Sequence, residues 1–355
     1  MKNIHFFGLI GLPLFILSFK SFYLSPPSDT FKISKGTNIA HWLSQSTRRG
    51  AERAAFFTEK DITFIKSAGF DHIRLPIDEE QLWTVDGQKE QDAFKLMEDC
   101  LRWCNKAGLN VIVDLHILRS HHFNAKEKPL WSKPEEQEKF IRFWQDLSSV
   151  LKKWPNRMLA YEIMNEPVAD DPEQWNTLLA KVITAIRGLE PQRTIVIGSN
   201  RWQSVETFDQ LKIPSGDKNI LLSYHFYSPF HLSHIHASWT KLKDFNGTVN
   251  YPGQIVVNGT TDEEKKIYNR DTLEKMMIKP FHLADSLHLP LYCGEFGIID
   301  GAPLGPKLAW YKDMVSIFRQ HHVAYANWNY KAGSFGIVDK DIKPDQTVIS
   351  ILVNK

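Results

Sequence analysis

Two glutamates stand out because each comes at the end of a strand-like apolar run. Glu166 directly follows Leu159–Asn165 (LAYEIMN), and Glu295 lies near the end of Leu289–Phe296 (LPLYCGEF). Two carboxyl groups can divide acid and base work between them when one is protonated and the other is ionised. Cleavage of a glycosidic bond needs this division, because one carboxylic acid protonates the leaving oxygen while a carboxylate stands opposite it. The pair therefore indicates carbohydrate chemistry, provided that the fold brings the two side chains together.

Other polar or aromatic side chains also end apolar runs along the chain. They are Arg74, His116, Asn165, His225, Tyr227 and Trp328. In a barrel of parallel strands, the carboxyl ends of the strands share one face, where the following loops build the active site. Together with the two glutamates, these side chains end six different runs. We therefore expect them to converge at one mouth.

Strand-like and helix-like patterns alternate along most of the chain, and these elements must position the side chains. Asn110–His116 (NVIVDLH) is apolar without alternation, which is typical of a buried parallel strand. Asp92–Ala107 carries apolar residues at helical spacing and is followed by Gly108, a helix-ending residue. Eight strand–helix units of this kind follow the first 35 residues. The pattern predicts an α/β fold, a single-domain (β/α)8 TIM barrel over residues 36–355.

Three stretches are less regular. We expect a short helix over Ser204–Leu211 and a long loop from Ser228 to about Thr260. We also expect a helix over Asp262–Leu287 that is broken near Pro280, since proline interrupts a helix. The long loop could wall off one end of a cleft.

Composition excludes several classes of partner. The 43 basic and 41 acidic residues leave a net charge of +2, which provides no electrostatic footprint for nucleic acid. The chain has no glycine-rich phosphate-binding motif, so we expect no nucleotide partner. Cys100 and Cys104 lie on one predicted helix with Cβ atoms roughly 5–6 Å apart, too far for a disulfide. We expect no disulfide, no metal and no cofactor, and a monomeric protein.

The first residues have the pattern of an export signal. Lys2 precedes an apolar run over Phe6–Phe19 that contains Pro13. This run is shorter than the roughly 20 residues needed to span a bilayer. We predict that residues 1–24 are a signal peptide or an uncleaved N-terminal anchor and that residues 25–35 are a linker. The protein would then be secreted, periplasmic or attached to the cell surface.

Two short motifs resemble those of one enzyme family. Ile163–Pro167 (IMNEP) resembles the acid/base motif of glycoside hydrolase family five, and Cys293–Gly297 (CGEFG) resembles its nucleophile motif. Further matching runs, in the same order, are His72–Pro76, Asp114–His116, Ser223–Tyr227 and Trp328. The resemblance covers about residues 36–340 and rests on the ordered set, because any one of these motifs is short.

The resemblance implies a role for each site residue. Glu166 would be the acid/base, and Glu295 would be the nucleophile of a retaining, double-displacement mechanism. Arg74 would keep Glu295 ionised, and Tyr227 would donate a hydrogen bond to it. Asn165 would bind the sugar 2-hydroxyl.

The remaining implied roles concern the sugar and the acid/base. His225 would lie beside the acid/base. His116 would bind a hydroxyl in the subsite before the cleaved bond, and Trp328 would be the stacking floor of that subsite. The implied activity is endo-acting cleavage of β-1,4-glucosidic bonds in cellulose-like glucans, with a β-linked polysaccharide or oligosaccharide as substrate.

Several alternatives stay open from the sequence. The same mechanism could act on mannan, xyloglucan or mixed-linkage glucan, or as an exo-β-glucanase, and sugar could replace water as the acceptor. A non-catalytic glycan-binding barrel would lack one of the two carboxylates. A metal-dependent hydrolase is disfavoured because the first strand ends in Asn38–His41 without a His-x-His motif. Other candidate contacts are a histidine-rich stretch (His231, His234, His236), His121 and His122, and four outer stacking residues (Trp42, Trp131, Trp202, Trp239).

Overall fold

The computed structural model describes residues 1, 29–256, 266–339, 341 and 343–353. Eight parallel strands close into a barrel in which neighbours follow chain order, and β11 pairs with β1. The strands are β1 (Lys35–Asn38), β2 (His72–Asp78), β3 (Asn110–Ile117), β4 (Leu159–Glu162), β5 (Thr194–Gly198), β6 (Ile220–Phe226), β10 (Leu291–Phe296) and β11 (Ala324–Asn327). The predicted (β/α)8 barrel is confirmed.

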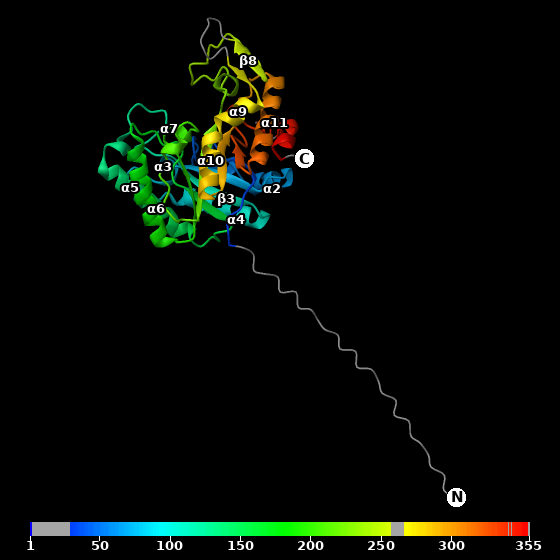
Figure 1. Cartoon of the computed structure of the whole chain (residues 1–355). Helices are drawn as coiled ribbons and strands as arrows, with labels where there is room; N and C mark the ends of the chain where they lie inside the picture. The colour runs from blue at the N-terminus through cyan, green and yellow to red at the C-terminus, as the bar shows by residue number, and fades with distance from the viewer. Residues whose placement is uncertain (2–28, 257–265, 340, 342, 354–355) are drawn as a thin grey trace.

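Helices cover the outside of the barrel (Figure 1). They are α1 (Gly50–Phe56), α2 (Glu59–Ala68), α3 (Glu79–Leu82), α4 (Gln91–Ala107), α5 (Pro134–Leu151), α6 (Pro172–Leu189), α7 (Asn200–Gln203), α8 (Phe230–Ser233), α9 (Arg270–Met276), α10 (Ile278–Leu287), α11 (Leu304–Gln320) and α12 (Gln346–Val353), with 3-10 turns η1 (Pro129–Trp131) and η2 (Phe208–Gln210). The expected end of α4 is confirmed: Gly108 has a φ of 67°, a left-handed conformation that glycine adopts without strain.

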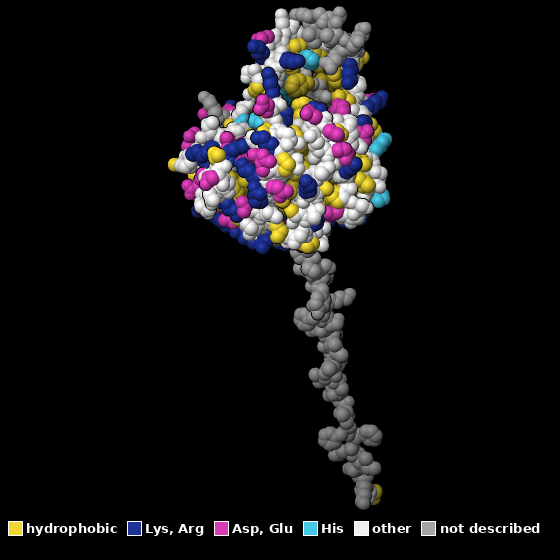
Figure 2. Space-filling model, turned by 90° about the vertical axis from the view of Figure 1, so that its left-hand side faces the viewer, with side chains coloured by type: hydrophobic (Ala, Val, Ile, Leu, Met, Phe, Trp, Pro, Cys, Tyr) yellow, Lys and Arg dark blue, Asp and Glu magenta, His cyan; other side chains and the backbone are white. Residues whose placement is uncertain are grey.

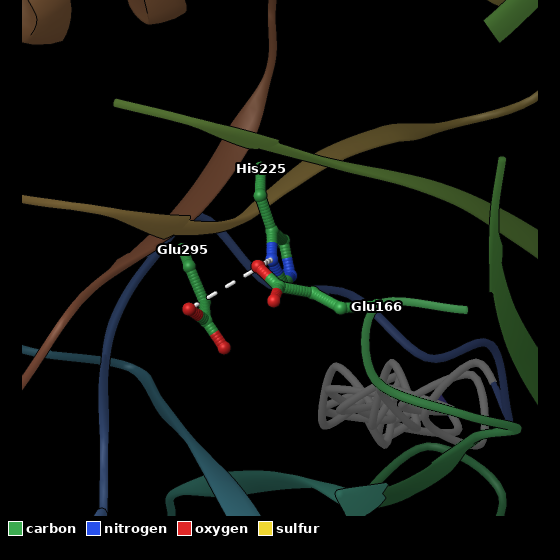
Figure 3. A group of neighbouring side chains, drawn as sticks. All are labelled: Glu166, His225 and Glu295. Atoms are coloured by element: carbon green, nitrogen blue, oxygen red, sulfur yellow. Dashed lines mark hydrogen bonds and ion pairs between the residues drawn. The ribbon is translucent and has the colours of Figure 1, made fainter. Parts of the chain in front are cut away.

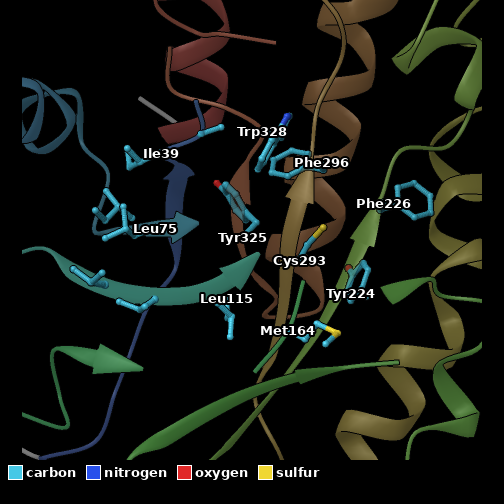
Figure 4. Close-up of a cluster of buried hydrophobic side chains, with 14 of the residues drawn as sticks. Ile39, Leu75, Leu115, Met164, Tyr224, Phe226, Cys293, Phe296, Tyr325 and Trp328 are labelled. Atoms are coloured by element: carbon cyan, nitrogen blue, oxygen red, sulfur yellow. The ribbon is translucent and has the colours of Figure 1, made fainter. Parts of the chain in front are cut away.

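The strands divide the core into an inner and an outer part because alternate side chains face opposite sides. Along β3, Val111, Val113 and Leu115 join the large cluster between strands and helices, part of which Figure 4 shows. Ile112 belongs instead to a small cluster inside the barrel with residues of five other strands. Asp114 lies two residues farther along β3 than Ile112, so its side chain also points into the barrel, but nearer the mouth. The interior thus changes from apolar to ionic toward the carboxyl ends of the strands.

The segment between β6 and α10 differs from the prediction. The expected loop contains α8 and two strands, β7 (Thr248–Val249) and β8 (Gly253–Val256), which form a small antiparallel sheet with β9 (Ile267–Tyr268). We call residues 228–256 the β6 insertion; β8 stands above the barrel in Figure 1. Strands of two to four residues leave too short an alternation to recognise in a sequence.

One helix prediction is confirmed in part and another was wrong. The long helix expected over Asp262–Leu287 is broken near Pro280, since α9 and α10 meet at Met277, and it ends at Leu287, but its described part begins as β9. Pro280 lies in the first turn of α10, where a missing N–H removes no helical hydrogen bond. Over Ser204–Leu211 the structure has the short turn η2 in place of a helix.

Charges of both signs intermix on the face shown in Figure 2. Residues 2–28, which include residues 2–24 of the predicted signal and the first four residues of the predicted linker (25–28), lie outside the described part of the chain. Among the described residues, no helix is long and apolar enough to cross a bilayer. Cys100, Cys104 and Cys293 are buried free thiols.

A buried ion pair ties the amino-terminal side of the barrel together. Glu190 accepts hydrogen bonds from Ser148 Oγ (2.7 Å) and Tyr161 OH (2.8 Å) and lies 2.7 Å from Arg193. Arg193 also donates to the Leu159 carbonyl at the start of β4 (2.9 Å). One carboxylate thus joins α5, β4 and the turn before β5, far from the two glutamates at the mouth.

We expect Glu190→Ala to lower the free energy of unfolding by about 3–5 kcal/mol, because it leaves the Arg193 charge buried without a partner. Denaturant unfolding followed by circular dichroism measures this loss. The control is Lys106→Ala, which removes the exposed Lys106–Glu59 pair and should cost about 0–1 kcal/mol. Equal losses in the two variants would contradict a structural role for the buried pair.

Candidate active site

The two glutamates meet at the mouth of the barrel. Glu166 lies on the loop after β4, and Glu295 lies within β10. Figure 3 shows their carboxyl groups and the His225 ring converging. An oxygen of Glu166 and an oxygen of Glu295 are within 4.8 Å of each other. This agrees with the roughly 5–5.5 Å of retaining glycosidases and is too short for the water that an inverting pair must accommodate.

Arg74 lies beneath this pair and is fully buried. Its Nη1 donates to Glu295 Oε1 at 2.7 Å, and its Nη2 donates to Asn165 Oδ1 at 2.9 Å. Its Nε donates to Glu162 Oε2 at 2.6 Å, and Nη2 lies 3.0 Å from Asp114 Oδ2. Since the guanidinium is planar and rigid, these contacts fix the directions of Glu295 and Asn165 together.

A bulge in β10 sets the position of Glu295. The register of β10 against β6 shifts between Cys293 and Glu295, and such a bulge re-aims the side chain that follows it. Gly294 lies inside the bulge, where an added Cβ would come within 3.1 Å of His225 Nε2. The Gly294 carbonyl accepts a hydrogen bond from Asn38 Nδ2 at 2.9 Å. Glycine at this position thus allows β10 and His225 to approach closely.

Two further side chains contact Glu295. The Tyr227 hydroxyl donates to Glu295 Oε2 at 3.0 Å. His225 Nδ1 lies 3.7 Å from the same oxygen and 2.9 Å from Glu166 Oε1. His225 therefore contacts both carboxyl groups. Burial lowers the pKa of His225 well below its usual value, so the ring is neutral in this site.

The backbone of Glu166 has a φ of 46°, a left-handed conformation that non-glycine residues adopt at some cost. A side chain from the next loop holds it there: Gln203 Oε1 accepts the Glu166 N–H at 3.0 Å. Gln203 Nε2 in turn donates to Glu162 Oε1 at 3.1 Å. Gln203 thus links the Glu166 loop to the carboxylates around Arg74.

The electrostatic environment separates the pKa values of the two carboxyl groups. Burial raises the pKa of Glu166 well above its usual value, and the charge of Glu295 raises it further. Burial also raises the pKa of Glu295, but the positive charge of Arg74 opposes that rise. Two carboxyl groups this close do not both ionise readily. We therefore assign the ionised form to Glu295 and the proton to Glu166.

The neighbouring floor of the site is aromatic. The His116 and Trp328 rings stack with centroids 5.5 Å apart and planes 6° apart. His116 Nδ1 lies 2.7 Å from Asp114 Oδ2, and its Nε2 lies 3.2 Å from Gln45 Nε2. Burial lowers the pKa of His116 to about 3, so its ring is neutral. These side chains form a flat, uncharged surface beside an ionised carboxylate.

The structure brings all eight predicted site residues together. A cavity of about 1020 Å³ is lined by seven of them, and the eighth, Arg74, lies beneath Glu295. The seven are His116, Asn165, Glu166, His225, Tyr227, Glu295 and Trp328.

The secondary candidates divide into cavity and packing residues. Trp202, Trp239, His122 and His234 line the cavity. Trp42 is fully buried and donates to the Arg53 carbonyl. Two more make packing contacts: Trp131 with Trp175, and His121 with Trp131. His234 also stacks on Phe230. His231 and His236 both lie against Phe245. Within the described ranges, the one group of side chains close enough to share a metal ion is Glu166, His225 and Glu295.

The sequence analysis missed several supporting residues, namely Asn38, Gln45, Glu162 and Gln203. Asn38 and Glu162 each carried a signal, because each is a polar residue inside or at the end of a short buried strand. Gln45 and Gln203 carried none, since Gln45 lies in the loop after β1 and Gln203 ends the four-residue helix α7, and the sequence reveals the course of neither segment.

Comparison with known proteins identifies the family. Residues 33–334 match the sequence model of the cellulase family (glycosyl hydrolase family 5). Endoglucanase C of Acetivibrio thermocellus is 32% identical over 339 residues, covering 90% of this chain and 98% of that protein. Cellodextrinase A of Ruminococcus flavefaciens is 27% identical over 296 residues, covering 82% of this chain and 84% of that protein.

Solved structures support the same family assignment. The endoglucanase Cel5A of Thermotoga maritima superposes with a TM-score of 0.75 at 25% identity, covering 90% of this chain and 96% of that one. Cellulose synthase subunit Z of Clostridioides difficile superposes with a TM-score of 0.74 at 26% identity, covering 90% and 99% of the two chains. With the barrel and the paired glutamates, these matches show that the chain belongs to the cellulase family, glycosyl hydrolase family 5.

Proposed function

We propose that the protein is a retaining endo-β-1,4-glucanase that cleaves cellulose-like β-glucans by double displacement. The observation that carries the proposal is the short distance between the Glu166 and Glu295 carboxyl groups, which have oxygens within 4.8 Å of each other. Of these two carboxyl groups, Arg74 pairs with Glu295. This arrangement favours one protonated and one ionised carboxyl group on opposite sides of a scissile bond. The similarity to endoglucanase C of A. thermocellus supports a β-glucan substrate.

In the first step Glu295 Oε attacks the anomeric carbon while Glu166 donates its proton to the leaving oxygen. The product is a glycosyl-enzyme ester at Glu295. In the second step Glu166, now a carboxylate, takes a proton from water as that water attacks the same carbon, and Glu295 leaves as a carboxylate. His225 stays neutral beside Glu166 and can exchange a hydrogen bond with either protonation state of that carboxyl group.

The other site residues take roles that follow from their positions. Asn165, oriented by Arg74, lies beside the nucleophile and would bind the 2-hydroxyl, a contact that strengthens in the transition state. Tyr227 would hold Glu295 ionised. The stacked pair His116 and Trp328 would form the floor and edge of the subsite that precedes the cleaved bond.

The shape of the cleft supports endo action. The catalytic cavity continues into a second cavity of about 590 Å³, with which it shares His41, Gln45, His122 and Gly333. At its opposite side the catalytic cavity reaches Trp202 and the β6 insertion. A chain bound across the mouth could therefore extend past the two carboxyl groups in both directions, which suits an internal bond.

The panel that tests the substrate contains carboxymethyl-cellulose, mixed-linkage glucan, glucomannan, mannan and xyloglucan. We expect the viscosity of a β-1,4-glucan to fall quickly relative to the release of reducing ends, because internal cleavage shortens chains early. Glu166→Ala and Glu295→Ala should each lower kcat/KM on that glucan by about 10²–10⁴-fold or more.

An activated aryl cellobioside provides the matched control. Its leaving group needs little protonation, so Glu166→Ala should lose much less of the glycosylation rate on it than on the polymer, whereas Glu295→Ala should be equally poor on both. Full activity of either variant on the glucan would refute the two-carboxylate assignment. Activity on mannan or xyloglucan alone would keep the mechanism and overturn the substrate.

The pH profile tests the role of Tyr227. A hydrogen bond donated to an ionised carboxylate lowers its pKa, so Tyr227→Phe should raise the pKa of Glu295. Since Glu295 must be ionised in the free enzyme, the acid limb of kcat/KM should move to higher pH. The control is Tyr251→Phe, which removes a hydroxyl bonded to Asp313 outside the site. An acid limb that moves equally in both variants, or in neither, would contradict the role.

We also propose that the protein is exported, with residues 1–24 as its signal or anchor. The proposal is supported by the apolar run at Phe6–Phe19 and by the size of a polysaccharide, which does not cross a bilayer. In a bacterial host, the full chain should appear in the medium or the envelope fraction. Sequencing of its first residues would distinguish cleavage from anchoring, and retention of the full chain in the cytosol would refute export.

A further inference from the structure

The Gln45 side chain lies where the two connected cavities meet. It lines the catalytic cavity and also the second cavity, and it is half-buried. Its Nε2 lies 3.2 Å from His116 Nε2. Its Oε1 and its second amide N–H have no protein partner among the described residues. The amide therefore keeps one acceptor and one donor that a ligand in the cleft could use.

The ring nitrogens of His116 are already occupied. Its Nδ1 lies 2.7 Å from Asp114 Oδ2, which also lies 3.0 Å from Arg74 Nη2. An oxygen that meets a guanidinium N–H is an acceptor, so His116 Nδ1 carries the ring proton and donates it. Because burial lowers the pKa of His116 to about 3, the ring has no second proton. Its Nε2 accepts the Gln45 amide N–H, and no N–H of His116 remains for a sugar hydroxyl.

Polar contacts on both sides fix the backbone of Gln45. This residue has a φ of 50°, a left-handed conformation that non-glycine residues adopt at some cost. Its N–H donates to Asp78 Oδ2 at 2.7 Å, and its carbonyl lies 3.4 Å from His41 Nδ1. The Asp78 N–H in turn donates to the Leu43 carbonyl at 2.8 Å. Since Asp78 ends β2 and is buried, it ties the turn that carries Gln45 to the barrel.

We propose that Gln45 binds a hydroxyl of the sugar ring that precedes the cleaved bond, and that Asp78 is the positioning residue that keeps Gln45 in place. The proposal rests on the retaining function proposed above. His116 stacks on Trp328 at the floor of that subsite, so the amide that bonds His116 lies at the edge of the same subsite. The hydroxyl contact that the family resemblance implies for His116 would thus be made by Gln45 in this chain.

The chemistry of the substrate narrows the contact to two hydroxyls. In a β-1,4-linked chain, the ring at the cleaved bond reacts at C1 and is joined to the next sugar through O4. Its 2-hydroxyl is assigned to Asn165, which lies beside Glu295. The 3-hydroxyl and the 6-hydroxyl remain, and the Gln45 amide would bind one of them.

The test uses 2,4-dinitrophenyl β-cellobioside and two analogues that lack the 3- or the 6-hydroxyl of the ring attached to the leaving group. We expect the loss of one of these hydroxyls to lower kcat/KM of the wild type by about five- to fiftyfold, because the Gln45 amide is left without a partner. Gln45→Ala should lose a similar factor on the complete substrate. On the same analogue it should lose less than about twofold more, because the contact is already absent.

His116→Phe tests whether the amide or the imidazole makes the contact. Phenylalanine keeps a flat ring beside Trp328 and removes both ring nitrogens. Since Gln45 is still present, this variant should remain slower on the same analogue than on the complete substrate. A His116→Phe enzyme that no longer distinguishes the two substrates would assign the hydroxyl to His116 and overturn the inference.

Two substitutions of Asp78 test its positioning role. Asp78→Asn keeps an oxygen that can accept the Gln45 N–H, so it should still distinguish the analogue from the complete substrate. Asp78→Ala removes that oxygen and should distinguish them as poorly as Gln45→Ala does. The matched control is Glu80→Ala, which removes an exposed carboxylate of the same second cavity and should behave as the wild type. Equal discrimination in Asp78→Asn and Asp78→Ala would contradict the role of Asp78.

The remaining outcomes separate this inference from the proposed function. If each missing hydroxyl costs Gln45→Ala as much as it costs the wild type, the inference is overturned and the proposed function stands. The same holds if neither missing hydroxyl slows the wild type. A wild type that does not hydrolyse the complete substrate overturns both.

Discussion

The site depends on one buried cation. Arg74 is the shared partner of Asp114, Glu162 and Glu295. A buried ion cluster of this kind adds little net stability, since desolvation offsets much of the attraction, but removing one member leaves charges without partners. Burial raises the pKa of Asp114 to about 7 even though Arg74 opposes the rise. The single positive charge of Arg74 is therefore shared among three carboxyl groups and cannot neutralise all of them, which favours protonation within the cluster. This shortage of positive charge keeps a proton available for Glu166.

The two glutamates are held in different ways, and the difference suits their tasks. Glu295 lies within β10 and accepts hydrogen bonds from Arg74 and Tyr227, so the carboxylate that we propose as the nucleophile is fixed on a rigid element. Glu166 lies on a loop in a left-handed conformation, and Gln203 holds its backbone. Its carboxyl group meets a neutral His225, which accepts or donates as the proton moves. A group that must both give and take a proton needs such an adaptable partner.

Much of the barrel could be predicted because buried parallel strands are short apolar runs that end in polar residues. Asn110–His116 and Leu159–Asn165 illustrate the pattern. The main site residues could be predicted because they lie at the carboxyl ends of such runs. The β6 insertion could not be predicted, because its strands are held by contacts between segments and not by a local pattern. Gln203 was missed for a related reason. Its role depends on a backbone turn with positive φ at three successive residues, 201–203, none of them glycine.

The β6 insertion contributes several residues to the cleft, among them Phe230, His234 and Trp239, but no strand to the barrel. Its described part is attached to the outer helices through contacts such as Tyr251 with Asp313 of α11. Changes in the insertion can therefore alter what the cleft accepts on one side without disturbing the eight strands or the Arg74 cluster. The range of accepted substrates and the bond-breaking chemistry therefore depend on different parts of the chain, so mutation can change the first while the second is retained.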